Sequence, residues 1–327
     1  MPVHNGRPYL SAAIRSLEQQ TFPDFDVLVI DDASDDGSTA ELAEWADRDQ
    51  RVTVIRNDEN RGLTACLNQG LSLARSPWIA RHDADDISHP QRLELQAAAL
   101  KKSPNLALLG TNAWMIDEKG RFRGLLNAPT GRDGALWSMI FYNPFIHGSV
   151  CFSLEKARAL GGFDPSFRIA QDYELWSRLV PRGLADNLPE RLVSYRLHAA
   201  SVTAATQDSH RKFLLEKIAA QALRAAGLHD LADPASTALP ENPGQEFSLT
   251  DWRTFDRRAQ WLLYHFRKLH PKADLASAVA LLNWKIAGGI HSALSPLRIQ
   301  KILAVALHSP GLFCRLLADS YRGRALC

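Results

Sequence analysis

The sequence WIARHDADD, residues 78–86, decides how the rest of the chain is interpreted. A short apolar run ends in three acidic residues within four positions, and Pro90 then opens a segment with apolar residues at helical spacing. This pattern predicts a strand, an acidic turn and a helix with the proline in its first turn. Carboxylates crowded at a strand end repel one another, and a bound Mg²⁺ or Mn²⁺ would relieve that repulsion through hard oxygen ligands. A solvated acidic turn is the alternative, so the weight of the metal hypothesis depends on the rest of the chain.

Strand and helix patterns alternate through residues 1–110. The pattern predicts apolar strands at 27–30, 52–55, 78–81 and 106–109. It predicts amphipathic helices at 10–17, 38–47, 63–74 and from residue 90. This alternation is typical of an α/β fold with a mostly parallel sheet flanked by helices, in which ligands bind at the C-terminal ends of the strands. Both acidic pairs, Asp31-Asp32 and Asp85-Asp86, are expected at such ends.

The composition describes a globular protein with a large core and excludes several functions. Of the 327 residues, 46% are hydrophobic and 23% are charged, which is ordinary for a globular protein. The net charge of +2 provides no overall basic field, so we expect no nucleic-acid partner. The sequence has no run of 18 apolar residues and no signal-peptide pattern. We therefore expect no transmembrane helix and a cytoplasmic location.

Several familiar motifs fail or are missing. The four cysteines have no CxxC spacing, which fits a reducing compartment, and Cys66 and Cys151 are expected in the core. DDASDDGSTAE resembles a calcium loop, but position twelve counted from Asp32 is Ala43 where such a loop needs Glu. Without GxGxxG or GxxxxGK, neither a dinucleotide fingerprint nor a P-loop is predicted.

The middle and the last third of the chain differ in character. Asp172 begins a helical pattern and is the expected N-cap, while residues 193–198 predict a strand that ends at His198. After residue 206 helical patterns dominate, at 208–226, 249–269, 273–287 and 296–320, with a linker or irregular loop at 227–247. We therefore expect an α/β domain of residues 1–206 and a helical region of residues 207–327. Basic amphipathic helices pack on a parent domain or lie on a membrane surface, and both alternatives stay open.

Five segments together resemble glycosyltransferase family 2 of the GT-A fold. They stand in family order between residue 2 and residue 203, and each is weakly specific alone, whereas the five in order are strongly specific. They are PVHNGRPYLSAAIRSLEQQTFPDFDVLVIDDASDDGS, NRGLTACLNQGL, RHDADDISHPQRL, GGFDPSFRIAQDYELWSRL and YRLHAASVT. The resemblance implies a Rossmann-like, mostly parallel sheet flanked by helices, followed here by the C-terminal helical extension.

The resemblance also implies an activity and a set of site residues. A metal-dependent, inverting enzyme would move a sugar from a nucleoside diphosphate sugar, of UDP type first, to a saccharide or lipid-linked acceptor in cell-envelope polysaccharide or glycolipid synthesis. Asp172 would be the general base. The implied ligands of Mg²⁺ or Mn²⁺ are Asp83, Asp85 and His198. The implied nucleotide-sugar contacts are Pro2, Val3, Asn5, Asp31, Asp32, Gly62 and Asp83. The implied acceptor side consists of His147, Gly148 and Trp176. The C-terminal helices would provide any peripheral contact with the inner face of the plasma membrane.

Two features depart from the family pattern. The family usually has Glu-Asp where this chain has Gln171-Asp172, so the base is kept and a neighbouring charge is lost. The family also begins with an apolar strand before PVHN, and we expect the native start to lie upstream of Met1. The QxxRW motif of the processive synthases does not occur, which favours transfer of one or few sugars. The alternatives are a degenerate relative that binds a nucleotide sugar or a partner without turnover, and a metal-dependent phosphohydrolase, which would need a nucleophile strand that this sequence lacks.

Overall fold

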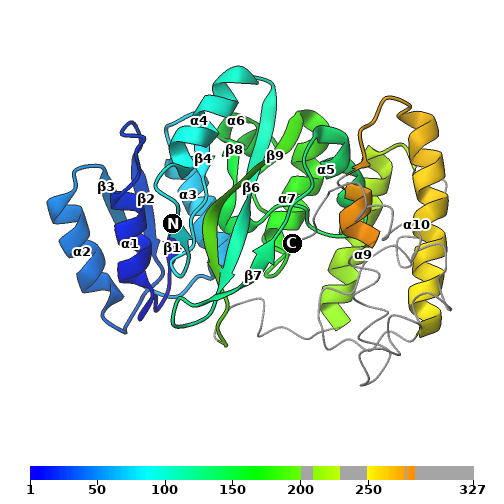
Figure 1. The fold of residues 1–327 in the computed structure, drawn as a ribbon. Coiled ribbons are helices and arrows are strands. Elements are labelled where there is room, and N and C mark those ends of the chain that lie inside the picture. The colour runs from blue at the N-terminus through cyan, green and yellow to red at the C-terminus, as the bar shows by residue number, and fades with distance from the viewer. Residues whose placement is uncertain (200–208, 229–248, 277, 284–327) are drawn as a thin grey trace. The chain divides into compact units, whose positions relative to one another are not determined.

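The computed structural model describes residues 1–199, 209–228, 249–276 and 278–283 (Figure 1). The chain divides into two compact units. Unit 1 consists of Met1–Ala128 and Phe145–Leu214, and unit 2 consists of Pro129–Pro144 and Leu215–Cys327. Residues 129–144 therefore group with the C-terminal unit, whereas the sequence analysis placed them in the domain of residues 1–206.

The first sheet of unit 1 is parallel and has the order β1-β2-β3. Its strands are β1 (Pro2–Val3), β2 (Val27–Asp31) and β3 (Val52–Arg56). Val3 pairs with Asp31, and Asp31 pairs with Arg56, so the three strands end at the same edge. That edge is where an α/β sheet binds its ligand.

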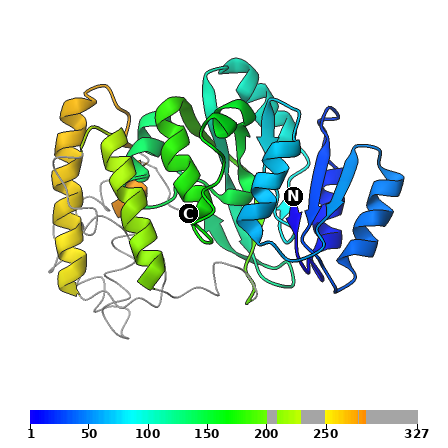
Figure 2. The ribbon, with the colours of Figure 1, turned by 180° about the vertical axis from the view of Figure 1, so that it is seen from behind.

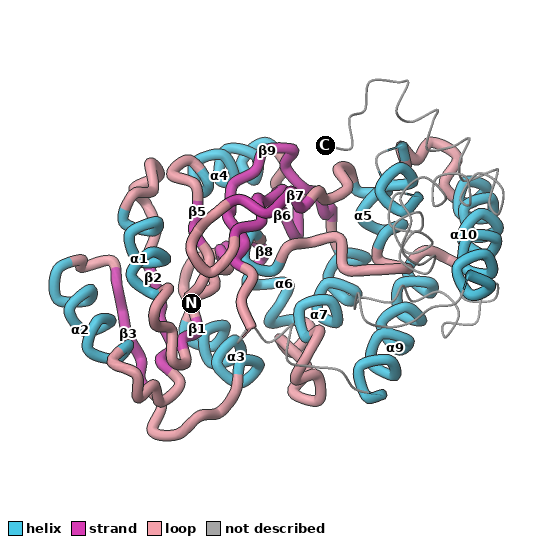
Figure 3. The backbone as a smooth tube through the Cα atoms, turned by 60° about the horizontal axis from the view of Figure 1, so that its bottom comes forward, coloured by secondary structure: helices cyan, strands magenta, loops and turns pink. Residues whose placement is uncertain are grey.

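Helices cover both faces of this first sheet. Helix α1 (Leu10–Glu18) places apolar residues at positions 10, 13, 14 and 17 on one face, and α2 (Ser38–Arg48) adds the buried Trp45 beside it. Both helices pack on the sheet through a core that includes Val29. Helix α3 (Leu63–Leu73) lies on the face of β1 and β2 opposite to α1 and α2, as the rear view (Figure 2) and the tube view (Figure 3) show.

The second sheet of unit 1 has six strands and mixed directions. Its order is β4 (Trp78–Ala80), β8 (Cys151–Ser153), β6 (Leu106–Ile116), β9 (Leu184–Arg196) and β5 (Ile87–Ser88), and β7 (Phe122–Leu126) pairs with β6. The β6–β9 pair is parallel, and the other pairs are antiparallel. The accompanying helices are α4 (Arg92–Lys102), η1 (His147–Ser149), α6 (Leu154–Ala159), α7 (Gln171–Leu179) and η2 (Val180–Arg182).

The predicted α/β class is confirmed, and the predicted strands and helices of the first hundred residues occur within a few residues of their expected ends. Cys66 and Cys151 are buried, as expected. The strand predicted at 106–109 continues to Ile116, and its partners β7, β8 and β9 come from later segments. The antiparallel pairs of the second sheet are thus a finding of the structure, because strand patterns alone do not fix direction.

Unit 2 is built on an aromatic core. It contains α5 (Arg132–Ser138), most of α9 (Ser209–Ala225) and α10 (Leu249–Leu269). The Trp137 ring centroid lies 4.9 Å from Phe141 and 5.4 Å from Phe266. The bounds of α9 and α10 confirm the helices predicted at 208–226 and 249–269, and residues 278–283 are helical as well. The helix predicted at 296–320, the end of the one predicted at 273–287 and most of the linker at 227–247 lie outside the described residues. Within the part of the chain that the structure describes, no helix is both long and apolar enough to span a bilayer.

Candidate active site

The acidic turn follows β4 and carries three carboxylates whose pKa values shift in different directions. Burial raises the pKa of Asp85, and it raises the pKa of Asp86 further, with the charge of Asp83 adding to both shifts. Burial also opposes ionisation of Asp83, but the paired Arg81 guanidinium holds the pKa of Asp83 below its usual value. The turn therefore concentrates negative charge that one arginine balances only in part.

The end of β9 fixes the acidic turn from the other side. His198 Nε2 lies 2.8 Å from Asp85 Oδ2. The Arg196 backbone N–H donates to Asp86 Oδ1 at 2.9 Å, and the Arg196 Nε donates to the Asp85 carbonyl at 2.8 Å. Tyr9 packs against both partners, with its ring 4.9 Å from the His198 ring and 4.7 Å from the Arg196 guanidinium. Two segments far apart in the sequence therefore meet, as the sequence analysis expected for Asp85 and His198.

The acidic turn and His198 offer oxygen and nitrogen donors of the kinds that divalent cations bind. Asp85 and His198 present an oxygen and a nitrogen side by side, and Asp86 Oδ2 is buried without a hydrogen-bond partner. Asp83, the third expected ligand, is instead paired with Arg81. Among the described residues, no group of three His, Cys, Asp or Glu side chains is already arranged as a metal cluster. Asp85 and His198 would hold the ion, and Asp86 offers the unpaired acceptor beside them.

The short helix η1 packs directly against the acidic turn. A Cβ on Gly148 would lie 2.5 Å from Asp86 Oδ2 and 3.1 Å from Asp83 Oδ2, so only glycine allows this approach. Burial and the charge of Arg81 lower the pKa of His147, and the carboxylates of Asp172 and Asp83 oppose that shift. His147 Nε2 is buried without a hydrogen-bond partner. The same imidazole is thus within electrostatic reach of the acidic turn and of the expected base.

Helix α7 carries Asp172 in its first turn. The helix begins at Gln171, and Ala170 precedes it in a left-handed conformation with φ 54° and ψ 23°. The expectation that Asp172 is the N-cap is therefore wrong, because Ala170 occupies that position. Trp176, expected on the acceptor side, has no exposed surface and packs 5.2 Å from the Phe152 ring. Its side chain belongs to the hydrophobic core, so we leave it out of the acceptor side.

The acids at the end of β2 organise the loops of the first sheet. Asp32 accepts hydrogen bonds from the Gly62 N–H at 2.8 Å, the Arg61 N–H at 3.0 Å and the Asn57 Nδ2 at 2.7 Å. Burial alone would raise the pKa of Asp32, but these hydrogen bonds bring it below its usual value. Asp31 accepts from the Thr39 hydroxyl at 2.6 Å. Both carboxylates are buried and engaged by the chain itself, so they shape the edge where a nucleotide is expected.

The expected contacts at the end of β1 join this same edge. Pro2 and Val3 pair with β2, which leaves the following turn beside Asp31 and Asp32. Asn5 has a positive φ of 52°, and its Oδ1 accepts from the Asp35 N–H at 2.9 Å. Gly62, with a φ of 85°, starts α3 at the place where Asp32 holds it. The structure therefore gathers this set of expected donor-side residues at one sheet edge.

Comparison with known proteins supplies the family. The glycosyl transferase family 2 model matches residues 1–155. The O-antigen biosynthesis glycosyltransferase WbnJ of Escherichia coli is 31% identical over 62% of this chain and 79% of its own length. The chain belongs to glycosyl transferase family 2. An uncharacterized glycosyltransferase of Haemophilus influenzae is 30% identical, and that match spans 60% of this chain and 63% of the relative, which is less than two thirds of its length.

A solved structure of a second glycosyltransferase shows the fold. S. aureus TarS, residues 1–349 in complex with UDP-GlcNAc, superposes with a TM-score of 0.58 over 98% of this chain and 90% of its own. At 17% sequence identity this likeness is one of architecture. It confirms the GT-A fold that the sequence analysis expected for a family 2 chain.

Sequence reasoning missed four polar residues of this family 2 site. They are Tyr9, Arg81, Asn57 and Arg196. Each acts through a partner distant in sequence, apart from Arg81, which pairs with Asp83 two positions later. The sequence did offer one signal for Arg81, since an arginine two positions before the first of three acids is placed to compensate their charge. Tyr9 and Arg196 carried no such signal, because their contact arises only when β9 ends beside α1.

Proposed function

We propose that this protein is an inverting glycosyltransferase that moves one sugar from a nucleoside diphosphate sugar to a saccharide or lipid-linked acceptor. The observation that carries the proposal is the 2.8 Å contact between His198 Nε2 and Asp85 Oδ2, which joins the end of β9 to the acidic turn of a family 2 chain. The charges of Asp83 and Asp172 both act on His147, which we place between the acidic turn and the first turn of α7. The leaving diphosphate would lie at the acidic turn and the acceptor hydroxyl at Asp172. The anomeric carbon of the sugar would lie between them, as a single displacement requires.

The side chains divide the chemistry between them. Asp172 takes the proton of the acceptor hydroxyl, a role that typically contributes about 10²–10⁴-fold to the rate. Burial and Arg81 lower the pKa of His147, which favours its neutral form, and we assign His147 a hydrogen bond to the acceptor. Arg81 balances part of the charge of the acidic turn. A divalent cation, Mg²⁺ or Mn²⁺, bound by Asp85 and His198 would neutralise the leaving diphosphate.

The edge of the first sheet is the proposed nucleotide site. Asp32 holds the N-terminus of α3 at Gly62, and Asn5 ties the turn after β1 to the loop after β2. These contacts leave backbone groups and loop surfaces, rather than the two buried carboxylates, as the parts that meet the nucleobase and ribose. We take UDP sugars as the first donors to test, because the TarS structure that shares this fold contains UDP-GlcNAc.

The acceptor is proposed to be a cell-envelope glycan or its lipid-linked precursor. The name of WbnJ places that 31% identical relative in O-antigen biosynthesis. A cytoplasmic enzyme of this type works at the inner face of the plasma membrane. Helix α10 offers a suitable surface, because exposed Trp261 and Tyr264 lie one turn apart and Lys268 continues the same stripe. Aromatic and basic side chains on one helix face suit an anionic bilayer surface.

The direct test is sugar transfer by the purified chain. A panel of UDP sugars and GDP-mannose is offered with Mn²⁺ and with simple glycosides that carry a hydrophobic aglycone, and release of the nucleoside diphosphate is measured. We expect release with one donor, and an anomeric configuration in the product opposite to that of the donor by NMR. A product with retained configuration, or tight nucleotide-sugar binding without any turnover, would contradict the proposal, and the latter result would favour the degenerate binding protein.

A further inference from the structure

The loop between α6 and α7, residues 160–170, leads directly into the helix that carries Asp172. The loop anchors itself in the core through two aromatic rings, since Phe163 and Phe167 are buried. It ends at Ala170, whose left-handed conformation sets the direction in which α7 starts. A non-glycine residue in that conformation needs support from its surroundings. The position of Asp172 therefore depends on what holds this loop.

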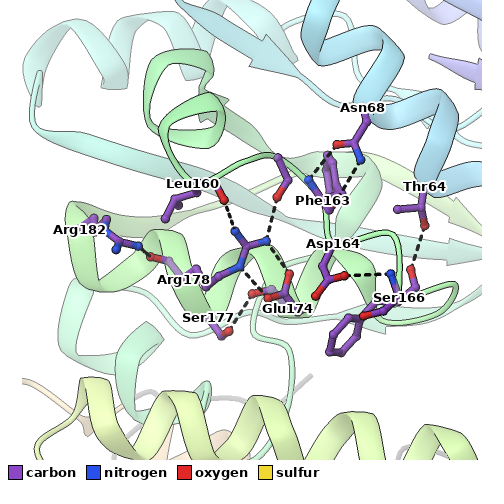
Figure 4. Close-up of polar contacts among 12 residues, drawn as sticks. Thr64, Asn68, Leu160, Phe163, Asp164, Ser166, Glu174, Ser177, Arg178 and Arg182 are labelled. Atoms are coloured by element: carbon purple, nitrogen blue, oxygen red, sulfur yellow. Dashed lines mark hydrogen bonds and ion pairs between the residues drawn. The ribbon is translucent and has the colours of Figure 1, made fainter.

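Helix α3 holds the loop at two points. The Asn68 carboxamide bonds both backbone groups of Phe163: its Oδ1 accepts from the Phe163 N–H at 2.9 Å, and its Nδ2 donates to the Phe163 carbonyl at 2.8 Å (Figure 4). Thr64, one turn earlier on the helix, donates its hydroxyl to the Phe167 carbonyl at 2.9 Å. Gly162 makes this approach possible, because a Cβ there would lie 2.6 Å from Asn68 Oδ1.

Helix α7 holds the same loop from its other end. The Arg178 guanidinium donates to the Leu160 and Gly162 carbonyls, each at 2.8 Å (Figure 4). The same guanidinium forms two hydrogen bonds of 2.6 Å with the carboxylate of Glu174, a residue that is 2% exposed. Such a bidentate pair with a buried carboxylate is geometrically specific. Glu174 lies two positions after Asp172, so Arg178 ties the beginning of the loop to the turn that bears the base.

We infer that Asn68 and the Glu174–Arg178 pair are positioning residues for Asp172. This inference rests on the proposed function, in which Asp172 is the general base. Helix α3 starts at Gly62, which Asp32 fixes at the proposed nucleotide edge, and it contacts the Asp172 loop through Asn68. One rigid helix therefore sets the donor-side loop and the base-side loop relative to each other. Misplacing a reacting group by about 1 Å can cost about 10²-fold in rate.

The test combines two backgrounds. Asn68→Leu keeps the side-chain size and removes both hydrogen bonds, and Ser72→Ala on the same helix is the control. In the wild-type background we expect Asn68→Leu to lower turnover about 10- to 100-fold while the affinity for UDP with Mn²⁺ is unchanged. In the Asp172→Asn background we expect no further loss from Asn68→Leu, because the residue acts only through the base. Equal losses in both backgrounds would overturn the inference.

A second pair of variants keeps the test decisive if Asn68→Leu folds poorly. Thr64→Ser keeps the hydroxyl and Thr64→Val keeps the shape, so we expect Thr64→Val to lose turnover and Thr64→Ser to retain it. Hydrogen–deuterium exchange of residues 160–172 needs no substrate, and we expect it to speed up in Asn68→Leu and Thr64→Val but not in Ser72→Ala. Unchanged exchange would overturn the inference while leaving the proposed function standing. Wild-type turnover in Asp172→Asn alone would instead contradict the proposed function.

Discussion

His198 Nε2 lies 2.8 Å from Asp85 Oδ2, although 113 positions separate the two residues in the chain. Asp85 belongs to the turn after β4, and His198 follows the end of β9. The contact joins the turn after β4 to the end of β9, two strands that are not neighbours in the second sheet. It also joins two residues that the family resemblance assigned to one metal site. This metal-site assignment predicts that Asp85 and His198 each contribute to metal-supported binding of the nucleotide.

Removing either partner should abolish metal-supported nucleotide binding. We expect Asp85→Ala and His198→Ala to lose the increase in melting temperature that UDP with Mn²⁺ gives the wild type, because ligand binding to the native state raises stability. Asp47→Ala, at an exposed position of α2, is the control. If both variants keep a Mn²⁺-dependent, chelator-sensitive shift, the metal assignment is wrong.

Gly148 should not tolerate a methyl group. In Gly148→Ala the new Cβ would lie 2.5 Å from Asp86 Oδ2, so the acidic turn must move. We expect lower stability and weaker binding of UDP with Mn²⁺, both measured by calorimetry. Gly70→Ala is the matched control, because Gly70 lies within α3 and a Cβ there meets nothing within 4 Å. It should be neutral or stabilise the protein by up to about 1 kcal/mol. Equal stability and equal binding of UDP with Mn²⁺ in the two variants would show that the close approach of Gly148 to Asp86 is not needed for binding.

Asp32 should stabilise the fold in a pH-dependent way. We expect Asp32→Asn to cost about 2–3 kcal/mol at neutral pH, since hydrogen bonds to a charged acceptor are lost and the Arg61 and Gly62 N–H groups then face a neutral amide. The folded-state pKa of Asp32 lies below the ordinary 3.8. Its contribution is therefore present above pH 3.8 and is lost as the pH falls through the lowered value.

Denaturant unfolding at several pH values measures this contribution. The difference between wild type and Asp32→Asn should shrink on acidification below the ordinary pKa, whereas exposed Asp35→Asn should show no difference at neutral pH. A constant difference across this range would mean that the carboxylate charge is not what the loop requires.

The elements of the first hundred residues and the expected meeting of Asp85 with His198 could be predicted from the sequence. The alternating pattern predicted the strand ends, and the family resemblance predicted that the end of β9 lies beside the acidic turn. The mixed directions of the second sheet could not be predicted, because β6 pairs with strands from three later segments. Trp176 was misjudged since helical position alone does not show which face is buried. The hydrogen bonds of Asp32 with the Arg61 and Gly62 N–H groups could not be predicted, because these residues become its neighbours only in the folded chain.

The exposed stripe of α10 should bind anionic membranes. We expect the chain to co-sediment with vesicles of phosphatidylglycerol and phosphatidylcholine, and the double change Trp261→Ala with Tyr264→Ala to weaken this binding. High salt should weaken it too, because a Lys or Arg near such a surface contributes about 1 kcal/mol through screened attraction. Leu73→Ala, at an exposed apolar position of α3, is the control. Absence of salt-sensitive co-sedimentation would leave α10 with a packing role alone.

The most direct test of the whole account is the turnover of Asp172→Asn. Ala170 rather than Asp172 is the N-cap, and Asn keeps the size of the Asp172 side chain, so we expect the loss of charge in the first helical turn to cost about 1 kcal/mol of stability. We predict an unchanged fold and unchanged affinity for the nucleotide sugar, with turnover reduced about 10²-fold or more, near 3 kcal/mol of barrier. Turnover close to that of the wild type would contradict the role of Asp172 and, with it, the inverting mechanism.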